Sequence, residues 1–169
     1  MTDLVSNSDV LWVVELWIDP DWYEVQEVSE PLPSPGLPEI IPILSQVNLI
    51  GRASPSRGIA PEIELQLDTG VSRRHAQLTT DGTRWWVEDL GSANGTFIGS
   101  AANPLPAMPI PEGKVEIHPG QYIYLGAWSK ILIRPAASEE AEAFSALLPG
   151  SDHQGIHTSE NETGENSGS

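Results

Sequence analysis

Short apolar segments separated by turn residues run through most of the chain. The segment 10–18 is rich in β-branched and aromatic residues and contains no glycine or proline, so it predicts a strand. The segment 63–67 alternates apolar and polar residues, which is typical of a half-buried strand with Ile63, Leu65 and Leu67 facing the core. Further short strands are predicted at 47–50, 75–80, 85–90, 96–98, 114–117, 121–125 and 131–134. Regularly spaced short strands indicate a β-sandwich or a barrel.

Two proline-rich segments, 29–42 and 101–113, interrupt this pattern and are predicted to be loops, because proline lacks a donor and fixes φ. Residues 138–148 predict one short helix with Ser138 as its N-cap. Residues 151–169 are almost entirely small or polar, and we expect them to be disordered.

Charge is distributed unevenly along the 169 residues, whose net charge is -16. Residues 1–51 contain nine acids and no base, and residues 136–169 contain seven acids and no base. Residues 52–84 differ, with five arginines against four acids. Such a chain repels nucleic acid and anionic lipid at long range, so we expect no nucleic-acid partner. Any bound anion must be held by local donors in the arginine-rich middle.

The sequence contains no cysteine, which excludes disulfides, thiolate metal sites and cysteine nucleophiles. We predict no catalytic residues, no metal site and no cofactor. No apolar stretch approaches 18 residues and no signal-peptide pattern is visible, so we expect no membrane insertion and a cytoplasmic location.

Three motifs carry the functional information: Gly51-Arg52, then Val-Ser-Arg-Arg-His-Ala at 71–76, then Asp-Leu-Gly-Ser-Ala-Asn-Gly-Thr-Phe at 89–97. Together they resemble the forkhead-associated (FHA) domain family, whose order of signals is Gly-Arg, Ser-x-x-His and Asn-Gly. The resemblance implies an all-β, SMAD/FHA-like sandwich of about 11 strands, with a short C-terminal helix and a disordered tail.

The implied domain organisation has three parts. Residues 1–9 form an N-terminal extension, and residues 10–135 form the FHA domain. Proline-rich loop insertions lie near 29–42 and 101–113. Residues 136–169 form an acidic, mostly disordered tail.

The resemblance also implies a function, namely a phosphothreonine-dependent protein-binding adaptor in Ser/Thr kinase signalling, and not an enzyme. Its partners would be phosphothreonine-containing proteins, with a Ser/Thr kinase upstream. A phosphothreonine brings close to two negative charges and three acceptor oxygens, so its receptor needs a guanidinium fork and short donors. Arg52 would supply the fork and Ser72 a hydroxyl donor. The other residues that the resemblance places at the phosphopeptide are Arg73, Ala93 and Asn94.

Within this resemblance Arg73 contacts phosphate or peptide, and Asn94 holds the main chain of the peptide. Ala93 departs from the hydroxyl residue of many relatives and offers only its backbone N–H. Four further residues are expected to support the site structurally: Gly51, His75, Gly95 and Thr96. His75 is expected to prop the binding loops from below.

Other readings of the same residues remain. Ser72, His75 and Asp89 could form a hydrolase triad, but no Gly-x-Ser-x-Gly elbow accompanies them. The fold could serve as a scaffold that binds without phosphate, which the alanine at position 93 favours. We also hypothesise that phosphorylation of Thr158 or Thr163 in the tail could close the site intramolecularly.

Overall fold

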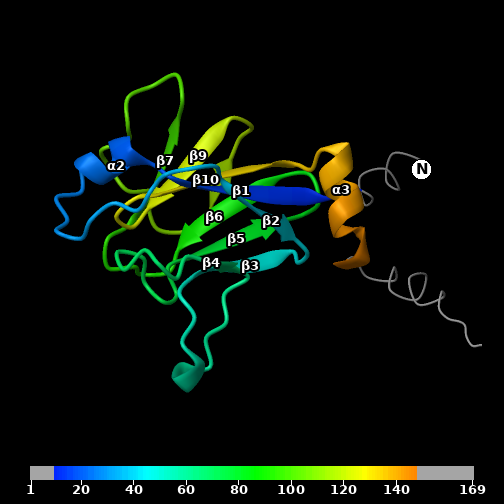
Figure 1. The fold of residues 1–169 in the computed structure, drawn as a ribbon, viewed down its shortest axis with the longest axis horizontal. Coiled ribbons are helices and arrows are strands. Elements are labelled where there is room, and N and C mark those ends of the chain that lie inside the picture. The colour runs from blue at the N-terminus through cyan, green and yellow to red at the C-terminus, as the bar shows by residue number, and fades with distance from the viewer. Residues whose placement is uncertain (1–9, 148–169) are drawn as a thin grey trace, which may run out of the picture.

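A computed structural model describes residues 10–147, which form two five-stranded β-sheets packed face to face (Figure 1). The expected N-terminal extension, the disordered tail and the hypothesis on Thr158 and Thr163 lie outside the described residues. The strands are β1 (Trp12–Ile18), β2 (Glu39–Ile43), β3 (Val47–Gly51), β4 (Ile63–Glu64), β5 (Ala76–Thr80), β6 (Trp85–Asp89), β7 (Thr96–Ser100), β8 (Val115–Ile117), β9 (Gln121–Leu125) and β10 (Ser129–Pro135).

The strand order is β2-β1-β10-β9-β7 in one sheet and β4-β3-β5-β6-β8 in the other. All neighbours are antiparallel except β3 and β4, which pair in parallel through only two residues each. The predicted all-β sandwich is therefore confirmed. Residues 10–147 contain ten strands where about 11 were expected.

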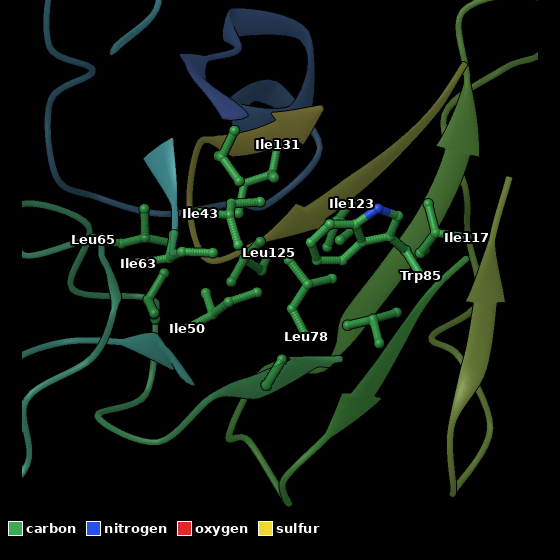
Figure 2. Close-up of a cluster of buried hydrophobic side chains, with 14 residues drawn as sticks. Ile43, Ile50, Ile63, Leu65, Leu78, Trp85, Ile117, Ile123, Leu125 and Ile131 are labelled. Carbon is green, nitrogen blue, oxygen red and sulfur yellow. The ribbon is translucent and has the colours of Figure 1, made fainter. Parts of the chain in front are cut away.

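The core lies between the two sheets and follows from the alternation of apolar residues along the strands (Figure 2). Ile123 and Ile131 come from one sheet and Ile50 and Leu78 from the other, and all four are fully buried. Trp85 closes one end of this core, where its ring meets that of Trp12 edge to face at 5.5 Å between centroids.

One predicted strand and one predicted loop differ from the structure. β4 covers only Ile63–Glu64, and a turn follows at 66–67. Ile63 and Leu65 are buried as predicted, but Leu67 is 76% exposed, so its assignment to the core was wrong. The turn breaks the two-residue period before position 67 is reached. The loop expected over 29–42 is also shorter, because its last residues form the edge strand β2 (Glu39–Ile43) on β1.

A five-residue helix that the apolar pattern did not predict follows β1. It is α2 (Pro20–Glu24), with the Asp19 side chain accepting from the N–H of Asp21. It buries Trp22, whose ring contacts those of Phe97 and Tyr124 and whose Nε1 donates to Gly126 O at 3.2 Å. This helix anchors the chain near the β9–β10 turn.

The C-terminal helix is α3 (Ser138–Phe144), followed by a 3-10 turn over Ser145–Leu147. Its N-cap is Ala137 rather than the predicted Ser138. Glu140 explains the shift, because its carboxylate accepts from Ala137 N at 2.9 Å and pairs with Arg134 of β10 at 2.8 Å. No helix within residues 10–147 is both long and apolar enough to cross a membrane.

Candidate functional site

Strand pairing brings the three sequence motifs to one end of the sandwich. The register of β3, β5 and β6 places Ile50 opposite Ala76 and Ala76 opposite Asp89. The residues that adjoin these paired positions therefore lie side by side, namely Gly51-Arg52, His75 and Leu90. Leu90 N donates to His75 O at 2.9 Å. Segments separated by about 20 residues in the sequence form a single rim.

Gly51 allows the β3 end to lie directly against the β4–β5 loop. A Cβ added at this buried position would stand 1.8 Å from the carbonyl oxygen of Arg73, a contact that no side chain can make. The same close approach lets Arg52 N donate to Arg73 O at 3.2 Å. The residue before Arg52 must therefore be glycine for the loop to close over the strand.

Arg52 is fixed by one of its own nitrogens. Its Nε donates to Val71 O at 2.6 Å, and Val71 is fully buried. Within residues 10–147 the two terminal nitrogens of the guanidinium have no hydrogen-bond or ion-pair partner. The backbone orients this side chain and leaves the terminal nitrogens available to an anion.

Ser72 lies next to Arg52 and is bound on its acceptor side. Its Oγ accepts from Ala93 N at 3.0 Å, which leaves the hydroxyl hydrogen for another acceptor. The backbone N–H of Ala93, which sequence reasoning offered to the phosphate, is therefore already engaged. This hydrogen bond joins the β4–β5 loop to the β6–β7 loop.

His75 ties the same two loops together from inside the fold. Its ring is fully buried, its Nδ1 accepts from Ser72 N at 2.9 Å, and its Nε2 lies 2.9 Å from Gly95 O. These partners require the neutral tautomer with the proton on Nε2. Burial lowers the pKa of His75 below the usual 6.5, although the hydrogen bond to Gly95 and the carboxylate of Asp89 act in the opposite direction.

Asp89 organises the β6–β7 loop, a role that sequence reasoning missed. Its carboxylate accepts from the Ser92 and Thr96 hydroxyls, each at 2.6 Å, and from the N–H groups of Gly91 and Ser92, each at 3.0 Å. Burial opposes ionisation, but the hydrogen bonds from Ser92 and Thr96 outweigh it and lower the pKa of Asp89. The Asp-x-x-Ser spacing is the sequence signal that could have indicated this turn.

Asn94 and Gly95 complete the rim. Asn94 is exposed, and its Nδ2 donates to Gly70 O at 2.9 Å, which links the tips of the two loops. Gly95 has φ of 86°, a conformation that glycine adopts without strain. Thr96, the first residue of β7, is fully buried and holds Asp89 as described above.

Asp68 is a second buried carboxylate that sequence reasoning did not single out. It is 1% exposed and accepts from Gly70 N, Ala127 N, Trp128 N and Ser129 Oγ at 2.7 to 3.1 Å. It thereby joins the base of the β4–β5 loop to the β9–β10 turn. The Asp-Thr-Gly segment after an apolar run is an Asx-turn signal that could have indicated its role.

Positive charge gathers on the same loops. Among residues 10–147, Arg84 pairs with Glu116, and Arg134 pairs with Glu15 and Glu140. The other four arginines of the chain make no ion pair to a described residue, and all lie in the β3–β4 and β4–β5 loops: Arg52, Arg57, Arg73 and Arg74. Arg73 and Arg74 are exposed. Two loops of a strongly acidic chain thus carry guanidiniums that no described carboxylate pairs with.

The residues of the alternative triad do not form a proton relay. Nδ1 of His75 is occupied by the backbone N–H of Ser72, and Nε2 faces Gly95 O, so neither ring nitrogen is directed at the Ser72 hydroxyl. Asp89 hydrogen-bonds to Ser92 and Thr96 rather than to the histidine ring. The three groups support loops in this structure.

The fold belongs to the class of two-sheet β-sandwich domains, and its end loops present guanidinium, hydroxyl and amide groups. The particular family follows from comparison with known proteins. Residues 48–126 match the family model of the FHA domain, and this part of the chain belongs to the FHA domain family, a family of protein-interaction modules.

Curated relatives share the same region. The FHA domain-containing protein FhaB of Mycobacterium tuberculosis is 43% identical over 61 residues, which are 36% of this chain and 36% of that protein. An FHA domain-containing protein of Arabidopsis thaliana is 36% identical over 66 residues, which are 39% of this chain and 16% of that protein. The chain thus spans about a third or less of the length of these relatives.

Among solved structures, full-length yeast Pml1p superposes with a TM-score of 0.53 and 15% identity, covering 80% of this chain and 90% of that one. At this identity the likeness shows the fold alone. It agrees with the sandwich described above.

Proposed function

We propose that this chain is a phosphothreonine-dependent protein-binding adaptor, with the phosphate bound by Arg52 and Ser72. One observation carries the proposal. The guanidinium of Arg52 is oriented through Nε by Val71 O, beside a serine whose hydroxyl oxygen already accepts from Ala93 N, so both side chains are held with unused donors. Preorganised donors of this kind suit a small, doubly charged anion.

In this proposal the phosphate receives hydrogen bonds from the terminal nitrogens of Arg52 and from the Ser72 hydroxyl. A phosphothreonine supplies three acceptor oxygens and close to two charges, which matches a planar fork plus one hydroxyl. Each charge-assisted hydrogen bond contributes about 1.5 to 3 kcal/mol net. A few such bonds with modest peptide contacts correspond to affinities on the order of micromolar.

Arg73, Ala93 and Asn94 would meet the peptide around the phosphate. Arg73 is exposed and makes no ion pair to a described residue, so it is available to phosphate or to acidic flanking residues. Asn94 would use its carbonyl oxygen for the peptide main chain, because its amide nitrogen is on Gly70. Ala93 would contribute through its N–H only if the hydrogen bond to Ser72 were given up.

The ligand of such a site has to be made by a Ser/Thr protein kinase, which places the adaptor downstream of one. The partners would be proteins that carry the phosphothreonine. The net charge of -16 argues against nucleic acid as an alternative polyanion, because only a local group of arginines offsets it.

Calorimetry with one threonine peptide, prepared with and without the phosphate, tests the proposal. The expected result is binding that requires the phosphate. Equal binding of the two forms would instead support the alternative, a scaffold that uses the same fold without phosphate. A phosphopeptide library would then identify the preferred sequence context.

A further inference from the structure

A groove of about 160 Å³ opens at the edge of the sandwich, outside the phosphate site. Residues of β1 and β10 line it together with Glu39 of β2 and Glu64 of β4. β2 and β4 are edge strands of opposite sheets. Its buried lining combines apolar and polar residues, namely Leu65, Trp128, Asp68 and Ser129. Its exposed rim includes Leu37 and Leu67. A cavity on the order of 150 Å³ with apolar walls holds a benzene molecule, so this groove has room for one apolar side chain.

Two leucines on the rim of the groove are largely exposed to solvent. Leu37 is 92% exposed and Leu67 is 76% exposed, and both line the same opening. Isolated exposed leucines need no explanation, but two that border one groove form an apolar surface whose burial would favour binding.

The groove also carries negative charge. Glu39 of β2 and Glu64 of β4 line it, and both are exposed. Neither carboxylate forms an ion pair or hydrogen bond with a residue of the described part. An apolar occupant would therefore be favoured further by a basic residue beside it.

The groove and the phosphate site share structural elements. Gln66, on the groove wall, accepts from the N–H of Ala53, the residue that follows Arg52. Asp68, also on the wall, accepts from Gly70 N and so begins the loop that carries Ser72. The proline-rich loop that supplies Leu37 is attached to this loop as well, because Thr69 Oγ1 donates to Glu30.

We propose that this groove is a specificity pocket for the phosphorylated partner, and that it takes an apolar side chain flanked by a lysine or arginine on one side of the phosphothreonine. The inference rests on the proposed function, since the phosphate on Arg52 and Ser72 anchors the peptide. The two ends of the peptide then meet opposite charges, with basic loops at the phosphate and carboxylates at the groove. This arrangement fixes the direction in which the peptide lies.

Fluorescence anisotropy with the full chain tests the pocket. The probes are phosphothreonine peptides in a Gly-Ser background, in which a Leu-Lys pair is moved through the positions on both sides of the phosphothreonine. One register is expected to bind about tenfold more tightly than the peptide without the pair, which corresponds to burial of part of a leucine side chain. The same register with Leu-Gln should show a smaller gain.

Variants separate the apolar and the charged contributions. Leu37→Ser with Leu67→Ser should remove most of the gain, and Glu39→Gln with Glu64→Gln should reduce it about twofold to fivefold for the lysine peptide only. Matched controls outside the groove are Leu44→Ser and Glu112→Gln, which should change nothing. All of these side chains are exposed, so the fold should persist.

The outcomes distinguish the two proposals. If phosphopeptides bind but every register has the same affinity, the pocket is refuted and the phosphate site stands. If unphosphorylated Leu-Lys peptides bind as tightly as phosphorylated ones, the proposed function fails and the specificity pocket fails with it. A gain that survives the leucine variants would also overturn the pocket.

Discussion

Arg52, Ser72 and His75 are held by backbone groups rather than by one another's side chains. Val71 O orients the arginine, Ala93 N binds the serine, and Ser72 N with Gly95 O fixes the histidine. Backbone partners keep the donors of Arg52 and Ser72 directed outward without neutralising them. This explains how unpaired polar groups are positioned at an exposed rim.

Arg52→Ala should abolish phosphopeptide binding, with an affinity loss of at least about a hundredfold, because two charge-assisted hydrogen bonds are removed. The melting temperature should change little, since the side chain is only partly buried and one of its hydrogen bonds ends on a carbonyl. Calorimetry and thermal melting measure both. Arg57→Ala is the matched control, because Arg57 is exposed and also makes no described ion pair. Binding by the Arg52 variant within about threefold of wild type would show that the phosphate lies elsewhere.

Protonation of His75 should destabilise the fold and the site together. Burial lowers the pKa of His75 in the folded chain below the value near 6.5 of the unfolded chain. The unfolded state therefore binds more protons below pH 6.5, so stability is complete above that pH and falls as the pH drops through it. A protonated Nδ1 would also face the N–H of Ser72, donor against donor.

Thermal melting between about pH 7.5 and pH 5.5 measures this dependence. The melting temperature should fall with pH in the wild type, and the fall should be weaker in His75→Gln, which cannot titrate there. Ser72→Ala serves as a second control, because it alters the rim and leaves the histidine in place. An equal slope in His75→Gln and wild type would assign the dependence to another group.

At the scale of elements, the loops matter more than the strands for the site. β4 is two residues long, so the β4–β5 segment is held by side chains instead of by a ladder. Asp68 holds the base of this segment and Asp89 holds the β6–β7 loop, each through four or more hydrogen bonds. The hydrogen bonds of these two carboxylates thus hold the loops in place where no β-ladder does.

Asp68→Ala should be strongly destabilising, because it leaves Ala127 N, Trp128 N and the Ser129 hydroxyl buried without their acceptor. Each unsatisfied group costs about 1 to 3 kcal/mol, so a loss of at least about 3 kcal/mol in unfolding free energy is expected. Urea denaturation measures it. Asp81→Ala is the control, since Asp81 also accepts several turn hydrogen bonds but is exposed to water. Equal losses in the two variants would mean that burial of Asp68 does not matter.

At the scale of the whole molecule, the chain has a net charge of -16. Within residues 10–147, four arginines of the β3–β4 and β4–β5 loops make no ion pair. Like charges at this density repel one another in the compact state and reduce its stability. The acidic surroundings also keep non-specific polyanions away from the arginine loops. If the proposed phosphate site is correct, this repulsion should add to its selectivity.

Sodium chloride should raise the melting temperature at neutral pH, because screening weakens this repulsion. Raising the salt from about 0.01 M to 0.5 M shortens the screening length from about 30 Å to a few ångströms. Differential scanning calorimetry measures the shift. The increase should disappear near pH 4.3, the isoelectric point, where little net charge is left to screen. A melting temperature that falls with salt at neutral pH would show that local ion pairs such as Arg134 with Glu140 dominate instead.

The sequence alone determined the sandwich and the order of its motifs. Strand periodicity and turn residues predicted nine of the strand positions, because a half-buried strand requires alternating apolar residues. It did not predict β2, since Glu39–Ile43 follows four prolines and pairs only with β1. The alternating pattern also predicted that Leu67 lies in the core, because a two-residue period carries no information about where a turn begins.

The tertiary structure decided how the site is held. Strand pairing brings distant segments together, and three contacts between them hold the site. Gly51 lies so close to Arg73 O that no Cβ would fit, and Arg52 Nε donates to Val71 O. Asp68 accepts hydrogen bonds from four donors. The same is true of the groove, whose rim leucines come from two separate loops and whose exposed carboxylates come from β2 and β4. Local patterns determine elements because they depend on neighbours in the chain, whereas close approaches and shared donors depend on which elements pack together.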